Sequence, residues 1–327
     1  MRADERLQDS ALHNALAMIY IDINKDPQTF LTNNQFYDAK VVGKYCEDRD
    51  PDLAFIAYKS AWGECDDEII AVTNKSYMFR SQASYLVERK DEPLWAKVLN
   101  PENPHRREII DQVVQFVLPQ TKDAEEVQVT VRAFMTAELP QELIELLERI
   151  VLHNSDFSSN DQLQNLLILT AIKSDRSRVM DYITRLDNYD AVGLAQEAEK
   201  DEYQLYDEAF TMYKKKDEFV KAITILLHKQ NNMKGASEFA EKISKPDVWT
   251  ELGKAQLDQS MLREAIESFI KAENPQAYMA VIHQAQVQQT WEELVTFLTM
   301  ARKTLKEQMI DNELIFAYAQ CGEKYLG

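Results

Sequence analysis

The chain has 327 residues, only 7 of them glycine, and its 55 acidic residues against 37 basic ones give a formal net charge of −18. A glycine share of about 2%, against a usual share of about 7%, disfavours phosphate loops, dinucleotide folds and turns with positive φ, all of which draw on glycine. The acidic balance disfavours binding to nucleic acid or to an anionic membrane surface, because both require a basic face.

The cysteines and the apolar runs indicate a cytoplasmic protein. Cys46, Cys65 and Cys321 form no CxxC pair, and so sparse and odd a set is typical of a reducing compartment without disulfides. We expect Cys46 and Cys65 to be small core residues. No stretch reaches the roughly 18 apolar residues that suggest a membrane-spanning helix. The first residues carry acids and no apolar segment, so we expect no signal peptide and no membrane insertion.

Signals for the start of a helix occur at short intervals along the chain. Asp50-Pro51, Asn103-Pro104 and Asn274-Pro275 each place a capping residue before a proline at the first helical position. The acids Asp66-Asp67-Glu68 precede an apolar run and predict a helix N-terminus. Thr290-Trp291-Glu292-Glu293 has the pattern of a capping box, in which Glu293 bonds back to the start of the helix.

The spacing of apolar residues predicts helices rather than strands. From Pro140 to Leu152 the polar residues fall on one narrow face, which is typical of a helix packed on several sides. Lys214-Lys215-Lys216 predicts the end of a helix, where cations stabilise the C-terminal dipole. No alternating pattern is long enough for a sheet, so the predicted fold class is all-α.

An internal repeat sets the predicted architecture. Three pairs of positions share an offset of 29, namely Ala236 and Ala265, Pro246 and Pro275, Trp249 and Tyr278. This period fits two helices of about a dozen residues with two short turns, and gives about eleven pairs (327/29). We therefore expect a right-handed α–α superhelix, a helical-hairpin solenoid that runs continuously over residues 1–327 with no separate globular domain.

Seven residues are expected to pack the hairpins together. Aromatic side chains would fill the base of a hairpin and alanines would sit where helices cross closely. The residues are Trp95, Ala236, Trp249, Ala265, Phe269, Tyr278 and Trp291. Part of this set also fits tetratricopeptide spacing, but that repeat has a period of about 34. One such period after Trp249 the chain reaches His283, and the motif does not recur there.

Motifs for catalysis or for metal and cofactor binding are not recognisable. Gly43-Lys44 lacks the other residues of a phosphate loop, and the segment from Asp22 to Asn33 lacks the glycine and the glutamate of a calcium loop. No two of the five histidines are spaced as zinc ligands on one helix. We expect no catalytic residue, no cofactor and no metal, and interpret the chain as structural rather than enzymatic.

Four long stretches resemble the leg of clathrin heavy chains, and with their spacers they cover nearly the whole chain. They are Asn33–Tyr58, Val129–Leu152, Leu163–Ala191 and Trp291–Lys303. The resemblance implies a solenoid of clathrin heavy-chain repeats in the distal leg, running toward the knee. Lys59–Cys65 and Glu197–Tyr206 look longer than the family pattern, and the match is lost from Gln320 to Gly327.

The resemblance implies a structural function in the coat of vesicles. The segment would be a stiff, curved strut of the clathrin lattice in endocytosis and intracellular transport, at the cytoplasmic face of coated pits and coated vesicles. Its implied partners are the legs of other heavy chains. Light chains and adaptors would bind through family parts that this chain lacks, and the isolated segment is expected to be monomeric.

Two other functions stay open at this point. A tetratricopeptide-like adaptor, which binds a peptide in its concave groove, would need a row of Asn, Lys or Arg at one repeat position, and none is recognisable. An enzyme whose site is assembled from distant residues would need a deep pocket with strongly perturbed titrating groups.

The repeat makes a testable prediction about size. A compact globule of 327 residues has a radius of gyration of about 20 Å. Eleven helix pairs stacked at roughly 9–10 Å per layer would instead form a rod of about 100 Å with a radius of gyration of about 30 Å. Small-angle X-ray scattering on the monomer measures this radius, and a value of about 20 Å would contradict the solenoid.

Overall fold

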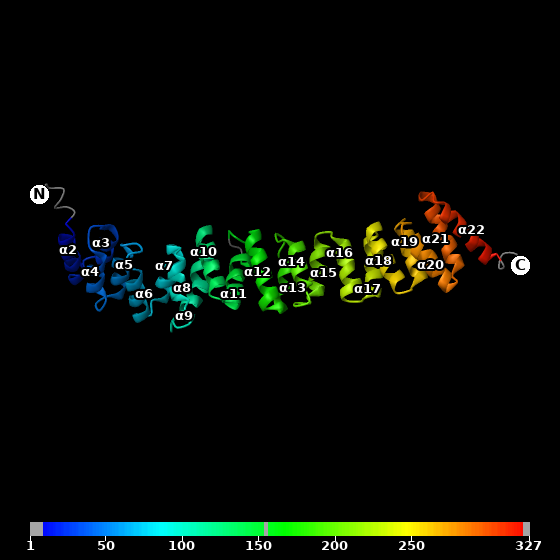
Figure 1. The fold of residues 1–327 in the computed structure, drawn as a ribbon. Helices are drawn as coiled ribbons and strands as arrows, with labels where there is room; N and C mark the ends of the chain where they lie inside the picture. Colours follow the sequence, from blue (N-terminus) through cyan, green and yellow to red (C-terminus); the bar gives the residue numbers. More distant parts are fainter. Residues whose placement is uncertain (1–8, 154–155, 323–327) are drawn as a thin grey trace. The chain divides into compact units, whose positions relative to one another are not determined.

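The computed structural model describes residues 9–153 and 156–322, and every regular element within these ranges is helical (Figure 1). This confirms the predicted all-α class of helical repeats. The chain divides into two compact units, Met1–Thr170 and Ala171–Gly327, and the boundary falls inside helix α12 (Asp161–Ser174).

In the first unit each helix packs mainly on its neighbours in the sequence. Its elements are α2 (Ser10–Asp22), α3 (Pro27–Asn33), α4 (Ala39–Cys46), α5 (Pro51–Lys59), α6 (Asp66–Lys75), α7 (Phe79–Arg89), α8 (Glu92–Val98), α9 (Arg106–Gln112), the π-helix η1 (Val113–Val117), the 3-10 helix η2 (Leu118–Gln120), α10 (Ala124–Thr136) and α11 (Pro140–Leu152). Helix α4 packs on α5, α7 packs on α9 and η1, and α10 packs on α7, α8 and α11.

The second unit continues the same pattern of neighbouring helices. Its elements are the 3-10 helix η3 (Arg176–Arg178), α13 (Val179–Arg185), α14 (Ala191–Ala198), α15 (Tyr206–Lys215), α16 (Phe219–Thr224), the π-helix η4 (Ile225–Lys229), α17 (Met233–Ile243), α18 (Pro246–Asp258), α19 (Leu262–Lys271), α20 (Tyr278–Gln288), α21 (Trp291–Thr304) and α22 (Gln308–Cys321). Helix α14 packs on α15, α18 on α19, and α21 on both α19 and α22.

Helix α11 shows how the local pattern produces burial. Its apolar face is buried, and the buried residues are Leu143, Ile144, Leu146, Leu147, Ile150 and Val151. Full burial of side chains of this size contributes roughly 1.5–3 kcal/mol each relative to exposure. The predicted helix from Pro140 to Leu152, with its wide apolar face, is therefore confirmed.

The Asp-Pro start signal is confirmed, whereas the two Asn-Pro signals are wrong. The Asp50 carboxylate accepts hydrogen bonds from the backbone N–H groups of Asp52 and Leu53 at 3.0 and 3.2 Å, and α5 begins at Pro51. Helices α9 and α20 begin only at Arg106 and Tyr278, beyond each asparagine-proline pair. Asn103 and Asn274 each accept a bond from the N–H two residues later, so they form turns before the helix rather than caps.

The predicted capping box at Thr290 gives the right helix start but the wrong contacts. Thr290 is the N-cap of α21, yet its hydroxyl oxygen is buried without a hydrogen-bond partner. The Glu293 carboxylate accepts instead from the guanidinium of Arg263, whose Nη2 lies 2.6 Å from Oε1. The Glu293 carboxylate, which the capping box would use as a hydrogen-bond acceptor, thus forms an ion pair with Arg263 of the preceding hairpin instead.

Turns between helices take up the left-handed backbone conformation without glycine. Gly63 is the one glycine with positive φ among the described residues, where twelve non-glycine residues also have positive φ. They are Asn24, Asp26, Tyr77, Lys90, Glu138, Gln204, Asp217, Asn231, Ser244, Ser260, Glu273 and Gln289. The expectation that a glycine-poor chain avoids such turns is wrong, because the cost of about 1–2 kcal/mol per residue is outweighed by the packing that follows each turn.

Substitution at one such turn tests this account. Glu138, exposed at φ 53 after α10, is expected to stabilise the chain when changed to glycine (Glu138→Gly) by about 0.5–1 kcal/mol, since glycine adopts this conformation without a steric cost. The matched control Glu267→Gly, at an exposed position inside α19, should destabilise by about 1 kcal/mol. Urea unfolding followed by circular dichroism measures both, and equal losses would contradict the prediction.

Candidate functional site

The structure places the seven residues predicted to pack the hairpins in or against the apolar core. Trp291, the first residue of α21, is partly buried, and the other six are buried. Those six are Trp95, Ala236, Trp249, Ala265, Phe269 and Tyr278. Ala265, Phe269 and Tyr278 belong to one core cluster, against which Trp291 packs, whereas Trp95 lies in the first unit beside Phe134. Their role in joining repeats stays a prediction.

Close approach of α18 and α19 depends on a small residue. A Cβ atom on Gly253 would lie 2.9 Å from Cε1 of Phe269, so any larger residue would have to displace that ring. Phe269 in turn meets Phe297 of α21 edge to face, with ring centroids 6.1 Å apart. The two rings thus lie in contact where α19 packs on α21 in the second unit.

Ion pairs between residues about one repeat apart form a second kind of joint, which we did not predict. In eight such pairs the partners lie between 27 and 30 positions apart in the sequence. They are Lys40–Glu68, Lys59–Glu88, Lys75–Asp48, Lys97–Asp67, Lys215–Asp187, Lys229–Asp201, Arg263–Glu293 and Lys271–Glu241. The separation equals one helix pair with its turns, so each ion pair connects successive repeats. We call this set the repeat-spaced ion pairs.

Side-chain bonds to backbone carbonyls follow the same spacing. The Gln284 amide donates to the carbonyl of Leu257 at 2.7 Å, near the end of α18. Lys215 donates to the carbonyls of Ile183 and Leu186 at the end of α13. The Lys214–Lys216 run ends helix α15, as predicted, but Lys215 also stabilises the C-terminus of the preceding hairpin.

Two of the repeat-spaced ion pairs, Lys215–Asp187 and Lys75–Asp48, are stronger at neutral pH than in acid. Hydrogen bonding to Lys215 lowers the pKa of the Asp187 carboxyl, and hydrogen bonding to Lys75 lowers the pKa of Asp48. A carboxyl whose folded-state pKa is lowered adds stability above its unfolded pKa and loses it as the pH falls through the folded pKa. These contacts are therefore fully formed at neutral pH and are lost progressively below about pH 4.

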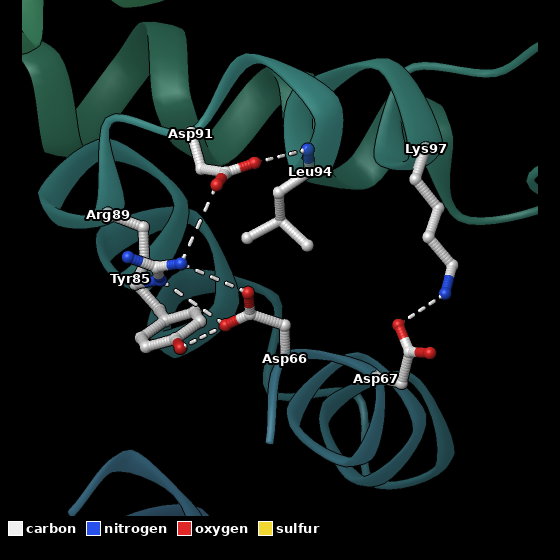
Figure 2. Close-up of polar contacts among 7 residues, drawn as sticks. All are labelled: Asp66, Asp67, Tyr85, Arg89, Asp91, Leu94 and Lys97. Atoms are coloured by element: carbon white, nitrogen blue, oxygen red, sulfur yellow. Dashed lines mark hydrogen bonds and ion pairs between the residues drawn. The ribbon is translucent and has the colours of Figure 1, made fainter. Parts of the chain in front are cut away.

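The most enclosed ion pair joins α6 to α7 (Figure 2). The Arg89 guanidinium reaches both oxygens of Asp66, with Nη2 3.2 Å from Oδ2 and Nε 3.3 Å from Oδ1. The two side chains are only 15% and 19% exposed. The Tyr85 hydroxyl also donates to Asp66, and burial together with this bond raises the pKa of Tyr85. Because both partners are shielded from water, their attraction is screened less than that of a surface pair.

Neighbouring contacts extend this cluster to α8. The Asp91 carboxylate caps α8 by accepting from the N–H of Leu94 at 2.8 Å, while its other oxygen lies 3.6 Å from Nη2 of Arg89. Asp67 pairs with Lys97 of α8 (Figure 2). The acids Asp66-Asp67-Glu68 do begin a helix, as predicted, but each also binds a cation from another helix, which no local pattern indicates.

The loop between α5 and α6 covers the Arg89 cluster. The Trp62 ring meets Tyr85 edge to face with centroids 5.7 Å apart, and the Arg89 guanidinium carbon lies 5.6 Å from the Trp62 ring. Gly63 has φ 89, and a Cβ there would lie 2.9 Å from Nη2 of Arg89. The loop therefore holds the arginine against its carboxylate.

Chemistry-bearing groups are sparse in the part of the chain that the structure describes. No three His, Cys, Asp or Glu side chains gather there as a metal-binding set, and none of its helices has the length and apolar character to cross a bilayer. Cys46, Cys65 and Cys321 are buried and form no disulfide, as expected for Cys46 and Cys65 as small core residues. Burial raises the pKa of Cys46 to about 11. A thiol that stays protonated at neutral pH is a poor nucleophile.

Comparison with known proteins gives matches along nearly the whole chain. A family model described as "Region in Clathrin and VPS" matches residues 1–110 and 118–264. The chain is 53% identical over 321 residues to a clathrin heavy chain of Drosophila melanogaster, in an alignment that covers 98% of this chain and 19% of that protein. It is 55% identical over 312 residues to a clathrin heavy chain of Dictyostelium discoideum, covering 95% and 18%. The chain thus spans about a fifth of the length of these relatives.

Removing the arginine of the enclosed pair tests its contribution. Arg89→Met leaves the Asp66 carboxylate shielded without a cation and should destabilise the chain by about 1–3 kcal/mol. Asp66→Asn completes a double-mutant cycle, with an expected coupling of about 1–2 kcal/mol. The control Arg185→Met breaks an ion pair with Asp181 whose side chains are 51% and 59% exposed, and should cost less than about 0.5 kcal/mol. Equal losses at both arginines would refute the role given to the enclosed pair.

Proposed function

The chain belongs to the family of clathrin heavy-chain repeats, and we propose on this basis that it serves as a stiff, curved strut of the clathrin lattice in vesicle transport. The observation that carries the proposal is the identity to clathrin heavy chains from distant organisms, 53% over 98% of the chain in one case and 55% over 95% in the other. The proposed role is mechanical and requires no catalytic residue or cofactor.

The joints between hairpins support a mechanical role. Each helix packs mainly on its sequence neighbours, so bending is the sum of small changes at many joints. Apolar contacts such as Phe269 on Phe297 hold the hairpins together, and the repeat-spaced ion pairs connect their surfaces. Exposed ion pairs contribute only about 0–1 kcal/mol each, so they resist displacement without fixing a joint in one position.

The strut proposal includes an architecture and a set of partners. We propose that residues 1–327 form one continuous solenoid of about eleven helix pairs, in which the seven packing residues join the hairpins. Its partners are the legs of neighbouring heavy chains at the cytoplasmic face of coated pits and coated vesicles. Weak leg-to-leg contacts repeated across a lattice give avidity while each contact stays reversible. We propose that light chains and adaptors bind outside this segment.

The tetratricopeptide-like adaptor is not favoured. The matching family model is described as a region in clathrin and VPS, and clathrin heavy chains match nearly the whole chain. The repeat interval from Trp249 to Tyr278 is also shorter than the tetratricopeptide period of about 34. Trp249 and Gly253, which fit the tetratricopeptide pattern, are both engaged in helix packing within the second unit.

A chimeric heavy chain tests the proposed function. This chain replaces the matching 321 residues of the Drosophila heavy chain, and purified subunits are placed under conditions in which the parent forms coats. We expect closed coats in electron microscopy, because the segment supplies a strut of the same length and joints. A parent that lacks the segment is the control and should not form regular coats. A chimera that folds, by circular dichroism, but does not form coats would overturn the proposal.

A further inference from the structure

Aromatic side chains gather on the surface of the first unit where the turn between α6 and α7 meets the start of α9. Tyr77 lies in that turn and is 75% exposed. Its ring centroid lies 5.9 Å from that of Phe79 and 6.2 Å from that of His105, and the Phe79 and His105 centroids are 5.1 Å apart. Three rings, from the α6–α7 turn, the start of α7 and the N-cap of α9, thus form one surface.

A cation and a fourth ring extend this surface along η1. The guanidinium carbon of Arg80 lies 5.5 Å from the centroid of Phe116, whose side chain is 40% exposed. His105 is the N-cap of α9, and Phe116 lies in η1, which continues α9 without a break. The two residues are eleven positions apart, about three helical turns, and so lie on nearly the same side of this segment. Tyr77, Phe79, Arg80, His105 and Phe116 form what we call the aromatic–arginine patch.

The backbone under the patch is irregular at both ends. Tyr77 has φ 58, a conformation that is uncommon for a residue other than glycine and rarer still for a bulky one. Phe116 lies in a π-helix, a rare element found frequently at functional sites. The two most exposed rings of the patch are therefore held on unusual backbone.

The charge of the patch is opposite to that of the chain. Arg80 is exposed and makes no ion pair with a carboxylate in the part of the chain that the structure describes, although acids exceed bases by 18 overall. An unpaired arginine beside exposed aromatic rings is a typical composition for the energetically important centre of an interface. The surface that complements it carries carboxylates, and a second copy of this chain has 55 acidic residues against 37 basic ones.

We propose that the aromatic–arginine patch binds surface carboxylates of a second copy of this chain, in the side-by-side contact of two legs. This inference rests on the proposed function. Five side chains cover far less than the roughly 800 Å² per partner of a stable complex, so a single contact is weak. Such a contact suits a lattice, where repetition supplies avidity, better than a soluble partner that must bind alone.

Sedimentation equilibrium of the wild-type chain from micromolar to millimolar concentration tests the proposal. We expect a monomer at micromolar concentration and weak, reversible self-association toward millimolar. Arg80→Glu should weaken association about tenfold, because it replaces the cation that faces the acidic copy. The control Lys234→Glu makes the same change in net charge at a side chain that is 90% exposed on α17, and should have a much smaller effect.

A second variant removes the aromatic contact without endangering the fold. Tyr77→Gly deletes the most exposed ring at a position whose positive φ suits glycine, and should weaken association several-fold. Its control is Tyr318→Ala, at a tyrosine of α22 that is 55% exposed. Equal effects of Arg80→Glu and Lys234→Glu, or association unchanged in Tyr77→Gly, would overturn the proposal.

The remaining outcomes separate this inference from the proposed function. A wild-type chain that stays monomeric at millimolar concentration overturns the proposal and would leave the patch to a different acidic protein. A chimeric heavy chain that forms coats equally well with and without Tyr77→Gly and Arg80→Glu overturns the patch while the strut function stands. A chimera that forms no coats without these changes overturns the strut function itself.

Discussion

A helix pair of this chain cannot bury its own apolar surface, and each pair therefore depends on the next. The core cluster of the second unit shows the dependence, because it runs without interruption from Leu257 at the end of α18 to Ala317 in α22. Phe269 and Phe297 are fully buried only because consecutive hairpins meet at their rings. Stability in such an array is a sum over neighbouring interfaces, so the order of the helices along the chain is also the order of their contacts.

The polar contacts follow from this packing. When hairpins stack at a fixed interval, a side chain on one repeat faces a side chain at the matching position of the next. The repeat-spaced ion pairs therefore have sequence separations close to the length of one repeat. Most of these pairs are exposed and individually weak. The Asp66–Arg89 ion pair differs because the Trp62 loop and Tyr85 shield it from water. It therefore holds α6 and α7 together more firmly than an exposed ion pair would.

The sequence predicted what depends on local pattern and missed what depends on partners. The helix from Pro140 and the Asp50 cap are local, since their contacts lie within a few residues. The capping box at Thr290 failed because Arg263, a full repeat earlier in the chain, binds the glutamate that the box requires. The left-handed turns were missed because a low glycine count indicates only the steric cost of positive φ for other residues. It does not indicate the free energy of helix packing that offsets this cost. The partners of Asp66 and the aromatic–arginine patch require helices to be placed in space.

Contacts confined to neighbouring repeats also decide how either unit would respond to a pulling force along its chain. Joints arranged in this way act as links in series, so every joint carries the full load and the weakest one opens first. A joint held by exposed ion pairs and few buried rings would separate while Phe269 and Phe297 keep their neighbours folded. Extension would therefore proceed in steps of one hairpin. When the force falls, the separated hairpins could pack on their neighbours again, and the unit would return to its original length.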